Sequence, residues 1–168
     1  FVFCATMGED LSMCNCERNG LSLLYYYAAA AAVILLDQLS KWWIVRSMEP
    51  GDSVPVIGSF FMITSHRNRG AAFGILQDQR TFFIIITIVI AIGLIWYLAK
   101  SAKEQKRLLS LAISFILGGA LGNFIDRVRM GEVVDFLHFR FRFNWFGTDI
   151  DYSYPIFNLA DAAICIGV

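Results

Sequence analysis

Two long uncharged stretches dominate the pattern of hydrophobic and polar positions along the chain. Residues 81–99 read TFFIIITIVIAIGLIWYLA, and residues 108–125 read LLSLAISFILGGALGNFI. A helix needs about 20 apolar residues to cross the hydrocarbon core of a membrane, and both stretches come close to that length. A buried helix of a soluble domain would explain one such stretch, but two in a chain of 168 residues favour an integral membrane protein.

Two further segments are weaker candidates for membrane helices. Residues 21–45 are apolar up to Asp37 and end beside Trp42 and Trp43, a residue type that the membrane interface favours. Residues 155–168 are apolar but too few to span a membrane. The sequence therefore predicts an all-α membrane protein with four transmembrane helices, the last of them truncated.

The domain organisation follows from these four segments. Residues 1–20 lack the basic region and small-residue cleavage site of a signal peptide, so we interpret them as an N-terminal extension without an assigned function. Residues 21–168 then form one four-helix membrane domain. The basic connection 100–107 (KSAKEQKR) favours a cytoplasmic position, which puts the connections 37–80 and 126–154 outside. Those outer connections also carry many arginines, so charge alone leaves the orientation open.

Both outer connections contain segments of strand composition. Residues 54–57 and 60–64 predict a small sheet on the membrane surface. Phenylalanine and arginine alternate over residues 139–143, which gives an extended segment one aromatic face and one guanidinium face. Such a segment could lie on lipid headgroups or be an ordinary amphipathic strand, and the sequence does not separate these two interpretations.

Composition and charge narrow the classes of function. Hydrophobic residues make up 57% of the chain, and 14 basic residues balance 14 acidic ones. A chain without excess positive charge has no basic stripe for nucleic acid, so we expect no nucleic-acid partner. With only two histidines and no H-E-x-x-H pattern, we expect neither a metal site nor a cofactor. The absence of a G-x-S-x-G pattern disfavours a serine hydrolase.

Ionisable residues near membrane helices are costly and need a reason. Asp37 and Lys41 stand four residues apart, on one helix face, which is typical of a neutralised pair at the wet end of a helix. Asn123, Asp126 and Arg127 form a second cluster at the end of the third predicted helix. Since a neighbouring arginine stabilises an ionised aspartate, we interpret Asp126 and Arg127 as a structural clamp.

Asp135 and Asp161 have no basic neighbour in sequence and form the candidate catalytic pair. Asp135 lies in the apolar stretch VVDFL, and Asp161 is predicted one and a half turns into the last helix, with Asn158 on the same face. Apolar surroundings raise the pKa of a carboxyl group, and two carboxyl groups held close together share a proton. One can then activate water as a base while the other protonates the substrate as an acid. From spacing alone this remains a hypothesis.

Five sequence blocks, taken in order, resemble those of the bacterial lipoprotein signal peptidases, also called signal peptidase II. The blocks are DQLSK at 37–41, NRGAAF at 68–73, GGALGNFIDR at 118–127, VVDF at 133–136 and FNLAD at 157–161. Each block alone is weakly specific, but five in family order are highly specific. The resemblance covers the chain from about residue 21 to the end.

The resemblance implies a membrane aspartyl endopeptidase of the bacterial cytoplasmic membrane, with both termini cytoplasmic and the active site facing outward. It implies that Asp135 and Asp161 form the catalytic dyad, and that the segment between them covers the site as a lid. Residues that would support or line the site are Asp37, Lys41, Asn68, Gly70, Asn123, Asp126, Arg127 and Asn158. The implied substrate is a prolipoprotein whose cysteine carries diacylglycerol, cut just before that cysteine. We further expect a monomer whose partners are this substrate and membrane lipids.

Two functions of other classes compete with a peptidase. A small proton or cation transporter or channel subunit would carry charges through the middle of several helices, whereas residues 81–99 and 108–125 are charge-free. A scaffold that binds other helices through Gly118, Gly119 and Gly122 would leave Asp135 and Asp161 without a reason. The sequence therefore favours the peptidase.

Overall fold

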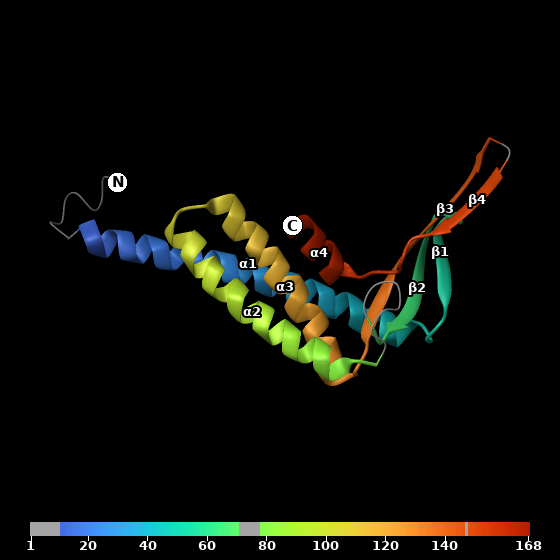
Figure 1. Ribbon diagram of the computed structural model, residues 1–168, viewed down its shortest axis with the longest axis horizontal. Coiled ribbons are helices and arrows are strands. Elements are labelled where there is room, and N and C mark those ends of the chain that lie inside the picture. The colour runs from blue at the N-terminus through green and yellow to red at the C-terminus, as the bar shows by residue number, and fades with distance from the viewer. Residues whose placement is uncertain (1–10, 71–77, 147) are drawn as a thin grey trace.

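The computed structural model describes residues 11–70, 78–146 and 148–168. The first ten residues of the predicted extension and residues 71–73 of the second sequence block lie outside this part. The elements in chain order are α1 Leu11–Ser47, β1 Ser53–Ile57, β2 Phe61–Asn68, α2 Arg80–Lys103, α3 Arg107–Arg129, β3 Val133–Trp145, β4 Thr148–Ser153 and α4 Leu159–Gly167. Figure 1 shows the helices side by side, with the sheet beyond one end of them.

Three helical segments are long and apolar enough to cross a membrane. They are Leu23–Ser47 within α1, Arg80–Lys103 and Arg107–Arg129, with mean hydropathies of 1.4, 2.7 and 2.0. Large apolar side chains point away from the bundle, such as Val89 at 60% exposure and Trp96 at 65%. Such an outer surface suits lipid rather than water. The chain is therefore a membrane protein, as the long uncharged stretches predicted.

The first helix extends further toward the N-terminus than the hydrophobic pattern predicted. It begins at Leu11, within the predicted extension 1–20, and continues without interruption to Ser47. The predicted boundary at residue 21 therefore does not coincide with a helix end.

The last helix is shorter than predicted and begins later. Residues 155–158 are not helical, because Phe157 instead pairs with Leu137 of β3 through backbone bonds of 2.8 and 3.1 Å. Asn158 is the N-cap of α4, and Asp161 completes a capping box with it. The prediction that Asp161 lies one and a half turns into the helix is therefore wrong, since it lies in the first turn.

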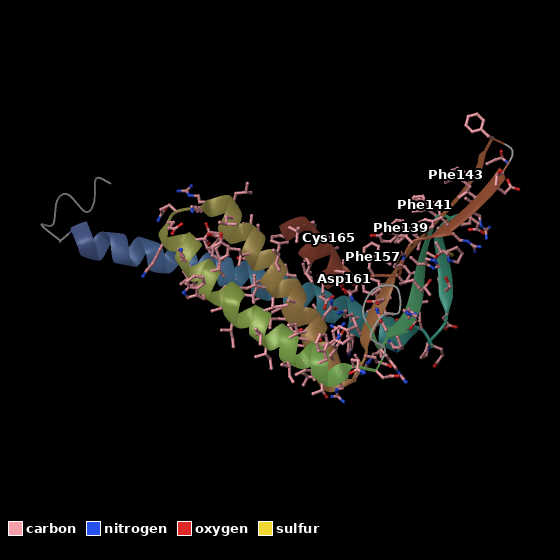
Figure 2. All side chains as sticks on the ribbon, viewed as in Figure 1. Phe139, Phe141, Phe143, Phe157, Asp161 and Cys165 are labelled. Carbon is pink, nitrogen blue, oxygen red and sulfur yellow. The ribbon has the colours of Figure 1, made fainter. Side chains whose placement is uncertain are left out.

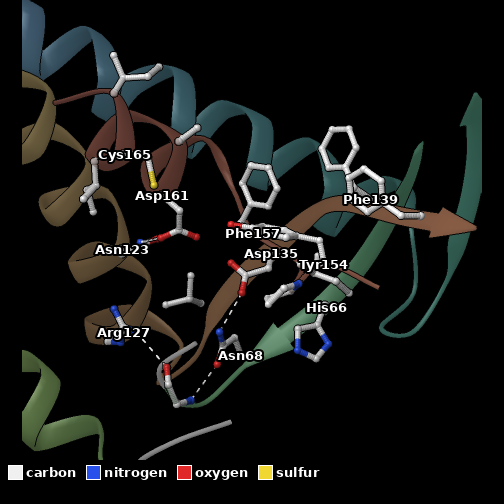
Figure 3. A pocket seen from close by; sticks show the side chains of 18 of the residues that line it. His66, Asn68, Asn123, Arg127, Asp135, Phe139, Tyr154, Phe157, Asp161 and Cys165 are labelled. Atoms are coloured by element: carbon white, nitrogen blue, oxygen red, sulfur yellow. Dashed lines mark hydrogen bonds between the residues drawn. The ribbon is translucent and has the colours of Figure 1, made fainter. Parts of the chain in front are cut away.

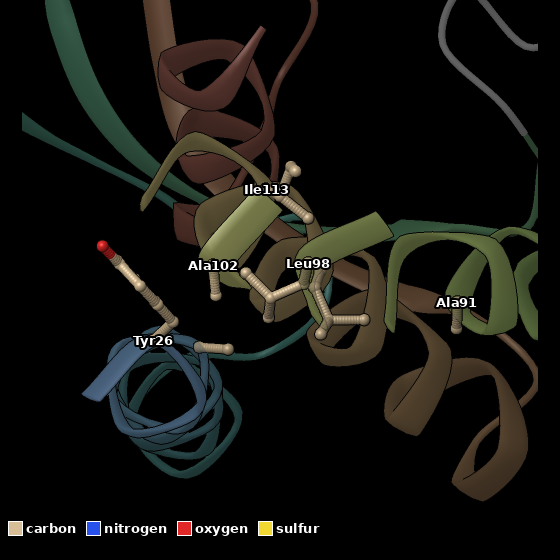
Figure 4. Packing of buried hydrophobic residues seen from close by; sticks show 7 residues of the cluster. Tyr26, Ala91, Leu98, Ala102 and Ile113 are labelled. Atoms are coloured by element: carbon tan, nitrogen blue, oxygen red, sulfur yellow. The ribbon is translucent and has the colours of Figure 1, made fainter. Parts of the chain in front are cut away.

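Helix α3 is the centre of the bundle, with α1, α2 and α4 packed around it. The apolar core includes Tyr26 of α1, Leu98 of α2, and Ile113 and Leu117 of α3. Figure 4 shows Leu98 and Ile113 close together between the helices, with Tyr26 of α1 to one side. Three of the core residues are alanines, and three glycines of α3 also allow close approaches between the helices.

The glycines of α3 serve helix packing, as small residues in membrane helices do. A Cβ at Gly118 would lie 2.7 Å from the carbonyl oxygen of Ala30, and one at Gly122 would lie 2.7 Å from a carboxylate oxygen of Asp37. A Cβ at Gly119 would collide with the carbonyl oxygen of Ala160. Gly119 and Gly122 therefore allow α4 and the carboxylate of Asp37 to approach α3.

We expect Gly119→Ala to lower the thermal stability, because the added methyl group meets the backbone of α4 and must displace that helix. Gly93→Ala is the matched control, since a Cβ at Gly93 meets nothing within 4 Å. That control should be neutral or stabilise by about 0.5–1 kcal/mol, the helix preference of alanine over glycine. Thermal unfolding in detergent measures both variants. Equal melting temperatures for the two would contradict the packing of α4 described here.

The four strands form one antiparallel sheet in the order β1-β2-β3-β4. The predicted strand segments at 54–57 and 60–64 are confirmed, and the sheet is larger than predicted because β3 and β4 add to it. The first half of β3 pairs with β2, and its second half pairs with β4. Asp135 lies on β3 and pairs with His66 of β2.

The outer half of β3 pairs only with β4 and projects as a hairpin (Figure 1). The segment 139–143, in which phenylalanine and arginine alternate, was predicted to be extended, and it forms part of strand β3. Figure 2 shows Phe139, Phe141 and Phe143 in sequence along this strand, leading away from Phe157 and Asp161. Arg140 and Arg142 both bond to Asp151 of β4.

Candidate active site

Asp135 occupies a buried position where β3 passes the beginning of α4. Its side chain is 1% exposed. Its Oδ2 accepts a hydrogen bond of 3.0 Å from Nδ2 of Asn68, and its Oδ1 accepts one of 2.6 Å from Nδ2 of Asn158. Two side-chain amides, one from β2 and one from the cap of α4, therefore hold the carboxyl group.

Asp161 projects from the first turn of α4 into the same region (Figure 3). Its Oδ1 accepts a hydrogen bond of 2.7 Å from Nδ2 of Asn123, and its Oδ2 accepts one of 3.2 Å from the backbone N–H of Asn158. The positive end of the α4 helix dipole also favours a negative charge at this place. Both carboxyl oxygens of Asp161 are thus held by hydrogen bonds at the N-terminal end of α4.

The three asparagine amides that serve these carboxyl groups all turn their NH₂ groups toward them. In each amide a separate donor occupies the carbonyl oxygen: the N–H of Gly70 for Asn68, Nζ of Lys41 for Asn123, and the N–H of Asp161 for Asn158. Since an N–H or an ammonium can only donate, the oxygen must face it and the NH₂ group must face the carboxyl. The amide orientations are therefore fixed by hydrogen-bond chemistry.

Burial raises the pKa of Asp135 to about 7, and the nearby Asp161 adds to this increase. The bonds from Asn68 and Asn158 act in the opposite direction because they stabilise the ionised form. Asp135 therefore exchanges its proton near neutral pH, as a group in general acid–base catalysis must.

A buried ion cluster lies behind the two carboxyl groups. Nζ of Lys41 lies 2.8 Å from carboxylate oxygens of both Asp37 and Asp126, and all three side chains are at most 3% exposed. Gln38 Nε2 donates to Asp126 Oδ1 at 2.8 Å, and Asp37 Oδ1 accepts the N–H of Ala160 at 3.0 Å. The cluster ties α1 to α3 and to the first turn of α4.

The predicted clamp between Asp126 and Arg127 is wrong. Neighbouring positions on a helix point in different directions, so Asp126 faces α1 and meets Lys41 instead. Arg127 donates from Nη2 to the carbonyl oxygen of Gly70 at 3.3 Å and lies over the ring of Phe83. The predicted Asp37–Lys41 pair is present, but it is buried rather than at a wet helix end.

A cavity of about 1020 Å³ opens beside these residues. Figure 3 shows Asp135 and Asp161 on its polar side, together with Asn68, Asn123 and Arg127. Aromatic and aliphatic side chains line the other side, from β3, from the segment before α4 and from α4 itself: Phe139, Phe141, Tyr154, Phe157, Ile164 and Ile166. The site therefore joins two carboxyl groups to a large apolar surface.

The structure brings together every residue that the sequence assigned to the site. Asn68, Gly70, Asn123, Asp135, Arg127 and Asp161 line the cavity, while Asp37, Lys41, Asp126 and Asn158 lie behind it. Sequence reasoning missed Gln38, although it stands within the DQLSK block. It also missed His66, which lines the cavity opposite Asp135 on β2 and which cross-strand pairing alone reveals.

Comparison with known proteins identifies the family. The model of the family described as signal peptidase (SPase) II matches residues 29–168. The chain belongs to the signal peptidase II family. It is accordingly a membrane peptidase of the aspartic type. A lipoprotein signal peptidase of Bacillus pumilus (strain SAFR-032) is 56% identical over 133 residues, which cover 79% of this chain and 80% of that protein.

Two solved structures of bacterial membrane enzymes, determined by the in meso method, share this fold. The structure at 2.3 Å resolution has a TM-score of 0.72 and 48% identity, covering 88% of this chain and 82% of the other. The structure at 1.9 Å has a TM-score of 0.68 and 48% identity, covering 88% and 87%. The resemblance to signal peptidase II that the five sequence blocks carried is confirmed.

Proposed function

We propose that this chain removes the signal peptide from diacylglyceryl-modified prolipoproteins by cutting just before the lipidated cysteine, with Asp135 and Asp161 as the catalytic dyad. The observation that carries the proposal is the meeting of two carboxyl groups, from β3 and from α4, on the polar side of a cavity whose other side is apolar. The lipoprotein signal peptidase to which the chain is similar has the matching activity in its name.

The two carboxyl groups take different roles in this mechanism. Asp161, with its donors from Asn123 and Asn158, is the base that removes a proton from the attacking water. Asp135, with its raised pKa, gives its proton to the carbonyl oxygen of the scissile peptide bond. When the tetrahedral intermediate breaks down, the proton on Asp161 passes to the leaving nitrogen. Asp135 then takes the proton back from the hydroxyl group, and the dyad returns to its starting state.

We also propose the membrane arrangement of the site. The dyad and the sheet face outward from the bacterial cytoplasmic membrane, both termini are cytoplasmic, and α4 provides the fourth transmembrane helix. In support, Figure 1 shows the basic α2–α3 connection at the end of the helices away from the sheet. The β3–β4 hairpin is the lid, since Phe139 and Phe141 line the cavity. The enzyme acts as a monomer in contact with lipids. Residues 21–168 form its peptidase domain, and residues 1–20 are an N-terminal extension without an assigned function.

The pH dependence of cleavage tests the proposed roles. Below a pKa of about 7 Asp135 carries the proton that it donates, and above this pH it loses that proton. We expect kcat/KM to fall about tenfold per pH unit on the alkaline side of pH 7. Asn68→Ala removes a donor that stabilises the ionised carboxylate, so the pKa of Asp135 rises and the alkaline limb moves to higher pH. The assay uses a diacylglyceryl peptide, and mass spectrometry identifies the product.

Thr64→Ala is the matched control for this measurement. Thr64 lies on β2 like Asn68, but its hydroxyl group bonds to Ser53 and His138 rather than to Asp135. Its alkaline limb should stay at the wild-type pH. An alkaline limb that moves to lower pH in Asn68→Ala would contradict the role of Asp135 as the acid.

A further inference from the structure

The amide of Asn123 differs from the other two amides of the site in what fixes its orientation. Backbone N–H groups, those of Gly70 and Asp161, hold the carbonyl oxygens of Asn68 and Asn158. The carbonyl oxygen of Asn123 instead accepts from a side chain, Nζ of Lys41, at 2.9 Å. The shortest bond to the oxygen of this one amide therefore depends on the residue type at position 41.

Lys41 has as many partners as it has hydrogens. Its ammonium group bonds to Asp37 and Asp126 at 2.8 Å each and to Asn123 at 2.9 Å, and the residue is 2% exposed. Two carboxylates already compensate its single charge, so neutralisation does not require the third bond. That third bond is directed at the oxygen of Asn123, and the opposite side of the same amide donates to Asp161.

Asn158 is the other donor to Asn123, and it fixes the amide less firmly. Its NH₂ group has two hydrogens and three acceptors: Asp135 Oδ1 at 2.6 Å, Asn123 Oδ1 at 3.1 Å and the carbonyl oxygen of Val134 at 3.4 Å. If the Asn123 amide inverted, Asn158 could turn its second hydrogen to Val134. An ammonium group at position 41 has no such alternative, because it would face an NH₂ group.

From this geometry we infer that Lys41 is a positioning residue of the peptidase: its ammonium group holds the Asn123 amide with the NH₂ group toward Asp161. This inference rests on the proposed function, in which Asp161 is the base. Without the ammonium group, the oxygen of the Asn123 amide keeps only the 3.1 Å bond from Asn158. The amide is then held less firmly, and its NH₂ group is no longer aimed as directly at Asp161. Lys41 thus acts on catalysis through Asn123 without touching the substrate.

The test compares variants that break different bonds of the same ammonium group. Lys41→Met removes the bond to Asn123 and should lower kcat about 100-fold, the loss typical of one oriented donor, with little change in KM. Asp126→Asn is the matched control: it removes the negative charge of one partner of Lys41 but keeps the bond from Lys41 to Asn123, so its kcat should fall far less than that of Lys41→Met.

A double variant separates positioning from folding. Lys41→Met leaves Asp37 and Asp126 buried as like charges, and Lys41→Met/Asp126→Asn removes one of them. The double variant should fold, judged by thermal unfolding, and should keep the low kcat with a KM close to that of the wild type. A wild-type kcat in either folded Lys41 variant would overturn the inference, and so would failure of both to fold, since Lys41 would then act through stability. Asp135→Asn and Asp161→Asn, assayed in parallel, test the proposed function separately: activity in those variants would reject the dyad, whatever Lys41 does.

Discussion

Replacing either Asp135 or Asp161 with asparagine is expected to lower kcat by about a thousandfold or more while the protein still inserts into membranes and folds. Asparagine has nearly the same shape as aspartate, but it can neither accept the proton of water nor return one to the substrate. The acid and the base act as a unit, so the double variant should be no slower than either single variant. Initial rates with a diacylglyceryl peptide measure all three.

Asp52→Asn is the matched control for these variants. Asp52 lies exposed in the turn between α1 and β1, where its carboxylate accepts the N–H of Glu49, and an asparagine oxygen can accept the same bond. Its activity should equal that of the wild type. Near-normal turnover in Asp135→Asn or Asp161→Asn would show that the dyad assignment is wrong.

A peptide with an unmodified cysteine should be cut at least about a hundredfold more slowly than the same peptide carrying diacylglycerol. The cavity has an apolar wall that includes Phe157, Ile164 and Ile166, so acyl chains can remain in an apolar environment while the peptide bond meets the carboxyl groups. Each buried CH₂ group contributes about 0.8 kcal/mol, and two long chains keep the substrate in the plane of the membrane. The enzyme then has only to orient the bond, which removes much of the entropic barrier.

Side-by-side mass-spectrometric assays of the lipidated and unmodified peptides decide this prediction. A peptide in which both acyl chains are short is the control, because it keeps the thioether and glycerol but loses most of the anchoring area. Its rate should fall between the other two. Equal cleavage of the lipidated and unmodified peptides would reject the lipoprotein substrate and leave an aspartic membrane peptidase.

The sequence predicted those features that depend on local pattern. The uncharged stretches predicted the long helices, and the alternation of phenylalanine and arginine predicted the strand that contains Phe139 and Phe141. Both patterns can be read from a short, continuous segment of the chain. The five blocks gave the site residues through resemblance. Before that resemblance, a catalytic pair of Asp135 and Asp161 was only a hypothesis, drawn from apolar surroundings and the lack of a basic neighbour.

Features that depend on long-range contacts were missed or wrongly predicted. Asp126 forms an ion pair with Lys41, which lies 85 positions earlier in the chain. The sequence neighbours of Asp126 had instead suggested Arg127 as its partner. Asp161 lies in the first turn because Phe157 joins β3 and Asn158 caps the helix, and hydrophobicity says nothing about either. Hydrophobic periodicity reports which face is buried, whereas the partner of a buried polar group is decided by the fold as a whole.

The late position of α4 in the chain bears on how the enzyme is synthesised. Asp161 enters the site only when α4 rests on Gly119 and its first turn donates to Asp37 on α1. With the proposed dyad, a nascent chain that has inserted α1 to α3 would carry Asp135 without its partner carboxyl group and would not hydrolyse a peptide bond. Hydrolytic capacity would then appear in one step, when α4 docks, so the membrane would never hold a partly built but active protease.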